Sequence, residues 1–543
     1  MQKRLSRNHH NLPPALGLIL FIILVFAAPL LAAAAADLPP EVRAIIESPR
    51  YRHARWGIMA QDIRTGQTLC AYNTDQLFGP ASVTKLFTAA AALDRLGPDY
   101  RFRTPLYRSG ELDSHGTLRG NLIFVASGDI TMGGRTLPDG RIAYTGIDQT
   151  IANGTSKNRE NIAKQDFRAG INQLAAQALR SGIRAVQGEI MIDDRLFKTS
   201  RVHSIINPGA TLFIRSPVII NDNLFDVVVN PTRDGALAAV SWRPKSPSLR
   251  VVSSIRTVAK DQPAQIDIHS PDGFGKYAAV GRIPEGSAAV VRRVAITDAS
   301  SFARDLLIEA LRKQGVKVKA SATAKNRTDR LPPPEDYRRL VKVGELVSPP
   351  LSEYIRMILK VSHNPGAEIL PHLIALPEGK TSFEDAMLLQ NGFLAQVITD
   401  PGSVSLADGS GLSHANLVTP GSVVQLLSYM TNHRDYLIFR NALPLLGVDG
   451  TLAWTGKASP SQGKILGKTG TLNLVDLLHD SAIVSSKTLA GYMTTAKGRQ
   501  IAFAFFVNDI HTTDVRGKTE TQKLTAETGE DLARIAEVIY LAN

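Results

Sequence analysis

A serine and a lysine stand three residues apart in the stretch Pro80–Lys85, which reads PASVTK. Strong helix formers follow at Leu86–Leu93, so we expect the pair at the head of a helix, on one face and one turn apart. Ser82 Oγ would then lie within hydrogen-bond reach of the Lys85 amine. A lysine that burial keeps neutral can take the hydroxyl proton, and a helix N-terminus favours the negative charge that develops there. The spacing indicates nucleophilic catalysis, although S-x-x-K alone also occurs by chance on solvated helix faces.

Two further tripeptides follow in the chain. Ser362-His363-Asn364 comes directly after a predicted helix, and Lys468-Thr469-Gly470 lies on a predicted strand. We interpret His363 as incidental, because only the outer two residues of S-x-N carry the motif. The order S-x-x-K, S-x-N, K-T-G is the signature of the penicillin-recognising serine acyl-transferases, and this chain resembles them in it.

The residue types of the first two motifs fit the proton transfers of acyl transfer. Ser82 would attack an amide carbonyl while Lys85 accepts its proton. Ser362 could relay that proton to the leaving amine, and Asn364 could orient both Lys85 and the substrate amide. The predicted catalytic residues are therefore Ser82, Lys85 and Ser362, with Asn364 binding substrate.

The third motif fits recognition of a substrate carboxylate. Lys468 would supply positive charge and help to keep the proton affinity of Lys85 low, while Thr469 and Thr471 offer hydroxyl groups. Gly470 completes the predicted substrate-binding set. The backbone N–H groups of Ser82 and Thr471 would hold the oxyanion, and the loss of one such donor typically costs about 2.7–4 kcal/mol.

The sequence disfavours metal-binding sites, phosphate-binding loops and serine hydrolases whose nucleophile lies in a G-x-S-x-G motif. The single cysteine, Cys70, excludes an internal disulfide and a cysteine-based metal site. The histidines show no metal-ligand spacing, and His203, His269 and His511 stand alone. A phosphate-binding loop needs four residues between its glycines, whereas Gly463 and Gly467 are separated by three, and G-x-S-x-G does not occur.

The N-terminal residues 1–36 have the pattern of a signal peptide. Lys3, Arg4 and Arg7 precede the apolar run Ala15–Leu31, and an alanine tract offers A-x-A cleavage sites. We therefore predict export to the periplasm; an uncleaved membrane anchor is the alternative. The net charge of +13 arises from scattered Lys and Arg without a nucleic-acid motif, so we expect no nucleic-acid partner. Peripheral membrane association and the oligomeric state stay open.

The pattern of elements predicts an α/β (α+β) fold in which a β-rich segment interrupts one domain. We assign residues 37–97 and 335–543 to a catalytic domain and 98–334 to inserted β-rich domains, with a nested subdomain at about 218–296. Predicted strands are Trp56–Ile63, Gln67–Tyr72, Gly120–Ser127, Val186–Ile192, Val316–Ala322, Ile465–Leu472 and Ile501–Val507. Predicted helices are Asp166–Ser181, Ser300–Gln314, Leu351–Lys360, Phe383–Val397, Pro420–Met430 and Thr519–Leu541, with Met132–Lys164 as a long surface loop.

Further stretches extend the resemblance over nearly all of the chain after the leader. They are Gly57–Gly66, Gly120–Asp129, Gly188–Asp194, Asn221–Pro231, Ser348–Glu353, Ala367-Glu368, Asp408–Ser413, Asn416–Pro420 and Asp449–Leu452. The chain resembles the D-alanyl-D-alanine carboxypeptidases/endopeptidases of the penicillin-binding protein 4 type (peptidase family S13, class C low-molecular-mass group). The long gap between Lys85 and Ser362 matches the two extra domains of this family.

The resemblance implies a β-lactamase-like catalytic domain and a periplasmic serine DD-peptidase that needs neither a metal nor a cofactor. Its partners would be peptidoglycan stem peptides, cleaved at D-Ala-D-Ala or at cross-links, and β-lactams, which would acylate Ser82. Pro365 and His414-Ala415 depart from the family pattern and bear on substrate preference. The alternatives are a non-catalytic envelope-binding homologue and a β-lactamase. The large insert and the lack of an obvious deacylating Glu motif disfavour the β-lactamase.

Overall fold

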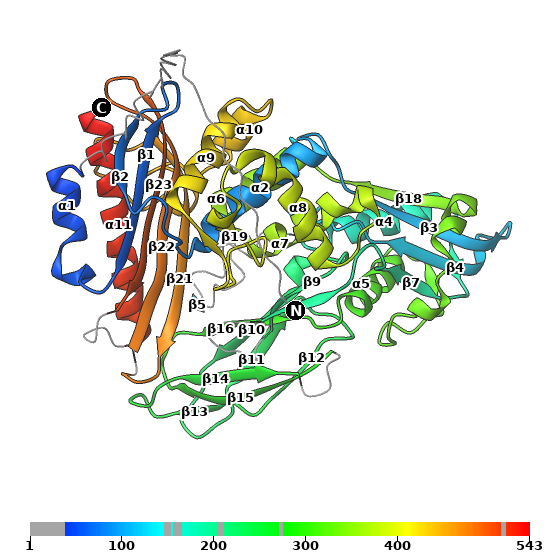
Figure 1. Cartoon of the computed structure of the whole chain (residues 1–543). Coiled ribbons are helices and arrows are strands. Elements are labelled where there is room, and N and C mark those ends of the chain that lie inside the picture. Colours follow the sequence, from blue (N-terminus) through cyan, green and yellow to red (C-terminus); the bar gives the residue numbers. More distant parts are fainter. Residues whose placement is uncertain are drawn as a thin grey trace, which may run out of the picture.

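The computed structural model describes residues 38–145, 154–155, 166–203, 211–270, 275–479, 481–511 and 517–543 (Figure 1). The predicted signal peptide, residues 1–36, lies outside these ranges. Among the residues described, no helix combines the length and the apolar character needed to cross a bilayer.

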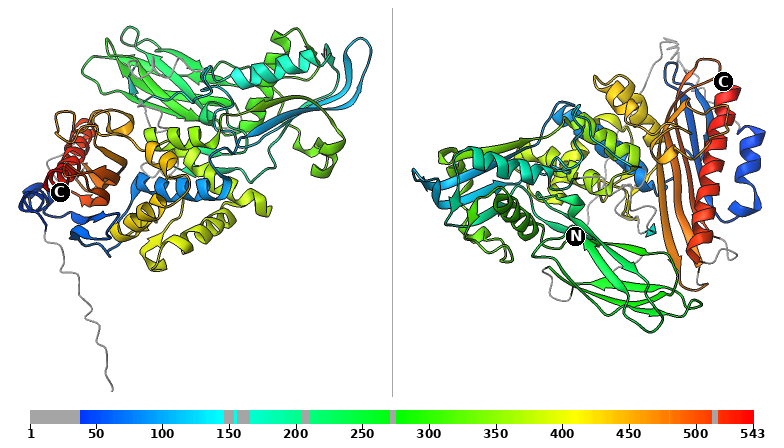
Figure 2. Two further views of the ribbon diagram at one scale, coloured as in Figure 1. Left: turned by 90° about the horizontal axis from the view of Figure 1, so that it is seen from above. Right: turned by 180° about the vertical axis from the view of Figure 1, so that it is seen from behind.

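Both ends of the chain build one five-stranded antiparallel sheet, in the order β2-β1-β23-β22-β21. Its strands are β1 (Arg55–Asp62), β2 (Thr68–Tyr72), β21 (Ile465–Asp476), β22 (Ser481–Thr494) and β23 (Gln500–Ile510). The run Ile501–Val507 in the central strand β23 is buried throughout, because both faces of the sheet are covered. Helices α1 (Pro40–Ile46) and α11 (Gly517–Ala542) cover one face (Figures 1 and 2).

A layer of helices packs against the other face of this sheet. It comprises α2 (Thr84–Leu96), α6 (Leu351–Val361), α7 (Asn364–Ala375), α8 (Phe383–Val397), α9 (Pro420–Thr431) and α10 (Tyr436–Asn441). The side chain of Ser382 caps α8, and Thr419 with Ser422 forms a capping box at the start of α9. These caps explain why the helices predicted to begin at Phe383 and Pro420 also begin there in the structure.

The segment between α2 and α6 is rich in strands, as predicted, and holds a six-stranded sheet flanked by two helices. Its elements are β3 (Arg103–Leu112), β4 (Thr117–Val125), β6 (Ala185–Val186), β7 (Ile190–Asp193), β17 (Lys317–Val318), β18 (Val341–Val347), α4 (Ala169–Arg180) and α5 (Ala299–Lys313). The mixed α/β class with a β-rich insert is thereby confirmed. The exact domain boundaries stay a prediction; β18 follows the expected boundary at residue 335 and pairs with β3.

Two smaller sheets lie in the predicted nested segment 218–296, drawn in green at the bottom of Figure 1. The first contains β10 (Leu224–Asn230), β11 (Ala239–Arg243), β16 (Val290–Ala295) and the earlier β5 (Gly154–Thr155). The second contains β12 (Arg250–Ser253), β13 (Arg256–Val258), β14 (Gln265–His269) and β15 (Lys276–Pro284). Short pairs complete the fold: β8 (Ser200–His203) with β9 (Thr211–Arg215), and β19 (Val404–Ser405) with β20 (Leu417–Val418).

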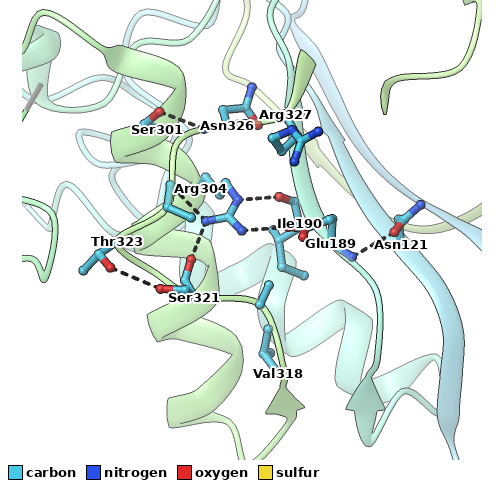
Figure 3. Close-up of polar contacts among 12 residues, drawn as sticks. Asn121, Glu189, Ile190, Ser301, Arg304, Val318, Ser321, Thr323, Asn326 and Arg327 are labelled. Carbon is cyan, nitrogen blue, oxygen red and sulfur yellow. Dashed lines mark hydrogen bonds and ion pairs between the residues drawn. The ribbon is translucent and has the colours of Figure 1, made fainter. Parts of the chain in front are cut away.

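A buried arginine ties the helix α5 to the insert's sheet (Figure 3). Arg304 is 1% exposed and pairs with Glu189 at 2.9 Å. Its guanidinium also donates to the carbonyl oxygens of Ile190, Ser321 and Ala324, at 2.7, 2.6 and 3.1 Å. A buried charge is tolerated only with such complete pairing, so this contact fixes the position of α5 against β7.

Several elements differ from the sequence predictions. The segment expected as one strand, Val186–Ile192, divides into β6 and β7, and the strand expected at Val316–Ala322 is limited to β17. The strand β22 was not predicted, because its serines, threonines and glycine break the apolar run. The expected surface loop Met132–Lys164 lies partly outside the described residues, and in the part described Met132 and Ile142 are buried.

Candidate active site

Ser82 lies in a single 3₁₀ turn, Ala81–Val83, and the helix α2 begins two residues later at Thr84. The predicted helix head is thus a tighter turn, yet the expected contact is present: Lys85 Nζ donates to Ser82 Oγ at 3.0 Å. Ala81 has a φ of +45°, in the left-handed region that residues with a side chain seldom adopt. Such strain is typical of a turn that presents a reactive side chain.

Lys85 is fully buried and donates to three acceptors from three separate segments. Besides Ser82 Oγ, these are Asn364 Oδ1 at 2.7 Å and the backbone carbonyl oxygen of Ser410. Burial lowers the pKa of Lys85 to about 7, against the opposing effect of the Asp408 and Glu368 carboxylates. A substantial fraction of this amine is therefore neutral near pH 7 and able to accept a proton.

The S-x-N motif forms the corner between two helices. Helix α6 ends at Val361, and Ser362 caps it in the left-handed region with a φ of +59°. Helix α7 then begins at Asn364, with Pro365 in its first turn, where proline is well tolerated. This helix was not predicted, because prolines at 365 and 371 interrupt the pattern. The sharp corner directs Asn364 to Lys85 and leaves Ser362 beside the third motif.

Strand β21 brings the K-T-G motif to the same place. Lys468 is fully buried and donates to Ser362 Oγ at 2.9 Å and to the carbonyl oxygen of Thr469 at 2.7 Å. Burial lowers the pKa of Lys468 well below its ordinary value, and the positive charges of Lys85 and Lys487 lower it further. Lys85 thus contacts Ser82 and Asn364, and Lys468 contacts Ser362.

Gly470 allows β21 to approach the turn Ala81–Val83, which holds Ser82. A Cβ atom at this position would lie 2.1 Å from Thr488 Oγ1 and 2.6 Å from the carbonyl oxygen of Pro80. Any larger residue would push β21 away from the turn that holds Ser82. The glycine of K-T-G is therefore required by the close packing of two backbones.

The two threonines of the third motif differ in their surroundings. Thr469 is half-buried and its hydroxyl lies 2.7 Å from Thr451 Oγ1. Thr471 is exposed and accepts a hydrogen bond from Lys487 Nζ at 2.9 Å. Burial lowers the pKa of Lys487 to about 8. The sequence predictions missed Lys487, because no motif marks β22; its position opposite Thr471 emerges only from the strand register.

Asp408 and Glu368 support Lys85. The sequence marked both residues only within stretches that resemble the family. Asp408 accepts from the backbone N–H groups of Gly411 and Ser413, at 2.7 and 2.6 Å, and so shapes the loop that presents the Ser410 carbonyl. Glu368 Oε1 accepts from the N–H group of Ser410 at 3.0 Å. Burial raises the pKa of Glu368 to about 7, as does the neighbouring Asp408 carboxylate. These residues position the Ser410 carbonyl oxygen that accepts from Lys85, but their types alone did not single them out.

His363 was interpreted as incidental, and the structure corrects this. Its side chain is fully buried, and its Nε2 lies 3.1 Å from Asp222 Oδ1, which belongs to the insert. His363 Nδ1 accepts from the N–H group of Gly366 at 3.0 Å and so caps α7. Asp222 also pairs with Arg135 at 3.1 Å. The middle residue of S-x-N therefore joins the insert to the corner that carries Ser362 and Asn364.

The comparison with protein families agrees with this geometry. The sequence matches the model of the D-Ala-D-Ala carboxypeptidase 3 (S13) family over residues 38–528. The chain belongs to this family. The match spans most of the chain and both parts of the five-stranded sheet, so the resemblance predicted from the motifs is confirmed, as is a serine-type peptidase.

Curated relatives and a solved structure extend this result. The chain is 25% identical over 479 residues to the D-alanyl-D-alanine carboxypeptidase DacB of Haemophilus influenzae, covering 86% of this chain and 88% of the relative. It is 27% identical over 513 residues to the D-alanyl-D-alanine carboxypeptidase of Actinomadura sp., covering 91% and 85%. The structure of penicillin binding protein 4 from H. influenzae matches with a TM-score of 0.70 at 22% identity, covering 92% of this chain and 99% of that one. A related structure of that H. influenzae protein holds a bound β-lactam.

Proposed function

We propose that this protein is a serine DD-peptidase that releases the terminal D-alanine of peptidoglycan stem peptides through an acyl-enzyme on Ser82. The observation that carries the proposal is the 3.0 Å contact between Ser82 Oγ and a fully buried amine, Lys85, whose pKa is lowered to about 7. A hydroxyl needs a base of this kind at neutral pH. Family membership adds support for the D-Ala-D-Ala substrate class.

In the acylation step, neutral Lys85 takes the proton of Ser82 while Oγ attacks the carbonyl carbon of the penultimate D-alanine. The tetrahedral intermediate then collapses, the C–N bond breaks, and the leaving amine takes a proton. Ser362, hydrogen-bonded to Lys468 and set beside Asn364, is positioned to pass that proton. Water attacks the resulting ester in the second step, with Lys85 again as base, and frees Ser82.

The terminal carboxylate of the substrate would bind along β21. We assign its recognition to Lys468, Thr469 and Thr471, and add Lys487, which already contacts the Thr471 hydroxyl. Burial lowers the pKa of Lys468, and a bound carboxylate would raise it again and so favour the charged form of the amine. The N–H groups of Ser82 and Thr471 would hold the oxyanion.

The test is the release of D-alanine from a pentapeptide ending in D-Ala-D-Ala, compared with the same peptide amidated at its C-terminus. We expect turnover of the free acid by the wild type, loss of turnover in Ser82→Ala, and a raised KM for the free acid in Lys468→Ala. The amide should be a poor substrate for the wild type, and the Lys468→Ala substitution should reduce its turnover only slightly further. Equal turnover of acid and amide would contradict the carboxylate site, and turnover by Ser82→Ala would contradict the nucleophile.

The finer parts of the proposal need their own assays. Cross-link cleavage would appear as conversion of a D-Ala-mDAP cross-linked muropeptide dimer to monomers, and penicillins should acylate Ser82. Rapid turnover of a chromogenic β-lactam would instead favour the β-lactamase alternative, and an inert folded protein would favour the envelope-binding one. We also propose export to the periplasm, which predicts a mature N-terminus near Asp37 in the extracted protein.

A further inference from the structure

Three side chains with metal-ligating atoms meet at the end of the five-stranded sheet that lies away from the catalytic motifs. Asp476 ends β21, His479 lies in the turn to β22, and His511 directly follows β23. One ligand atom from each lies within 4.8 Å of the other two. The cluster is separated from Lys468 by eight residues of extended strand, about 26 Å. It is thus remote from the proposed chemistry.

The carboxylate of Asp476 is held in a fixed orientation. Its Oδ1 accepts from the backbone N–H groups of Leu478 and His479, at 3.0 and 3.3 Å. Its Oδ2 faces the two imidazoles, 2.8 Å from His479 Nδ1 and 2.7 Å from His511 Nε2. The backbone therefore occupies one oxygen, and the other faces both ring nitrogens and also accepts from Ser481 Oγ at 3.2 Å. Carboxylates that bind metals are commonly held by such additional hydrogen bonds.

We propose that Asp476, His479 and His511 bind a divalent first-row transition metal ion, of which Zn²⁺ suits the donor set best. The two imidazole nitrogens are borderline donors that favour Zn²⁺ over Mg²⁺ and Ca²⁺, which prefer oxygen ligands, and zinc also accepts a carboxylate oxygen. A tetrahedral zinc site with bonds of about 2.0–2.2 Å holds its ligand atoms about 3.3 Å apart. The present contacts of 2.7 and 2.8 Å need only a small outward shift to admit the ion.

Each imidazole would bind the ion through the nitrogen that now faces Asp476 and keep its proton on the other ring nitrogen. The side chains of His479 and His511 are 42% and 31% exposed, so an ion can reach them from solvent. The fourth ligand would be water. A bound ion would join the turn between β21 and β22 to the end of β23, and so tie the ends of three neighbouring strands together.

No motif in the sequence marks this site, because Asp476 and His479 lie more than thirty positions before His511. The expectation that His511 stands alone is corrected by its contact with Asp476. The fold brings the residues together, since β21, β22 and β23 form two consecutive hairpins.

Isothermal titration of Zn²⁺ into untagged full-length protein tests the proposal. We expect one saturable site in the wild type, with affinity at least about tenfold weaker in the double variant His479→Gln/His511→Gln. Co²⁺ provides an independent readout, since a tetrahedral site with nitrogen and oxygen ligands gives strong visible absorption that the double variant should lose. Zn²⁺ should also raise the Tm of the wild type and leave that of the double variant unchanged.

The matched control is His269→Gln, which removes another exposed histidine whose Nδ1 lies 3.3 Å from a carboxylate, that of Asp267. This variant should bind Zn²⁺ like the wild type. The pair His9-His10 is shared by all the variants, so differences among them report on the proposed site alone. Equal Zn²⁺ affinity in the wild type and the double variant, or no saturable binding by the wild type, would overturn the proposal.

Discussion

The lowered pKa of Lys85 should set the pH dependence of Ser82 acylation. Only the neutral amine can accept the hydroxyl proton, so the acylation rate should rise with pH as Lys85 loses its proton. With a pKa of about 7, the neutral fraction grows about tenfold between pH 6 and pH 8 and is nearly complete above pH 8. A lysine at its ordinary value would give a rise of about a hundredfold over the same interval, with no plateau before pH 10.

The perturbation that tests this cause is Glu368→Gln. The charged groups that face Lys85 are Asp408, Glu368 and Lys468, and the two carboxylates raise its pKa. Glutamine keeps the oxygen that accepts from the Ser410 N–H group but removes the negative charge. The pKa of Lys85 should therefore fall, and the rise in acylation rate should move to lower pH.

The assay is the second-order rate of labelling by a fluorescent penicillin from pH 5.5 to 9.5, with circular dichroism at each pH to confirm that the protein stays folded. The wild type should level off near pH 8, and Glu368→Gln should level off earlier. A rate that climbs with unit slope to pH 9.5 would refute the lowered pKa. A shift of the Glu368→Gln profile to higher pH would refute the electrostatic role of this carboxylate.

Three further perturbations test separate contacts. Gly470→Ala should slow penicillin labelling by about 100-fold and lower the Tm, since its Cβ would collide with the turn that holds Ser82; unchanged labelling and Tm would show that the strand can shift without cost. Arg304→Ala should lower the free energy of unfolding of the insert by about 3–5 kcal/mol, measured by urea titration, because Glu189 loses its buried partner; a change below 1 kcal/mol would argue against that role. Asp222→Asn should slow penicillin labelling and speed limited proteolysis between the insert and the corner that carries Ser362 and Asn364. Rates of labelling and proteolysis equal to those of the wild type would contradict a role for the contact between His363 and Asp222.

Motif order and spacing singled out five side chains that lie close together in the fold, because each motif is short and local geometry places the residues within it; their catalytic roles stay a prediction. The S-x-x-K spacing needs only a single helical turn, and the K-T-G motif needs only a strand. The structure accordingly brings Ser82, Lys85, Ser362, Asn364 and Lys468 together. The longest apolar runs, such as Ile501–Val507, also predicted their strands correctly, because a strand that is buried on both faces is apolar along its length.

The remaining features depend on contacts between distant segments, which spacing does not encode. The role of His363 requires Asp222 from the insert, and the Ser410 carbonyl reaches Lys85 only because Asp408 shapes its loop. Lys487 lies opposite Thr471 because of the pairing register between β21 and β22, and β22 has no long apolar run that would predict it. Helix α7 was missed because its prolines read as interruptions, although the first of them occupies a position where proline is favourable.

The most direct test of the account is intact-mass analysis of the purified protein with and without benzylpenicillin, followed by peptide mapping. We expect a single adduct of one penicillin per chain, located on the peptide that contains Ser82, and no adduct in Ser82→Ala. A folded wild-type protein that forms no adduct, or an adduct that maps to another residue, would contradict the assignment of Ser82 as the nucleophile.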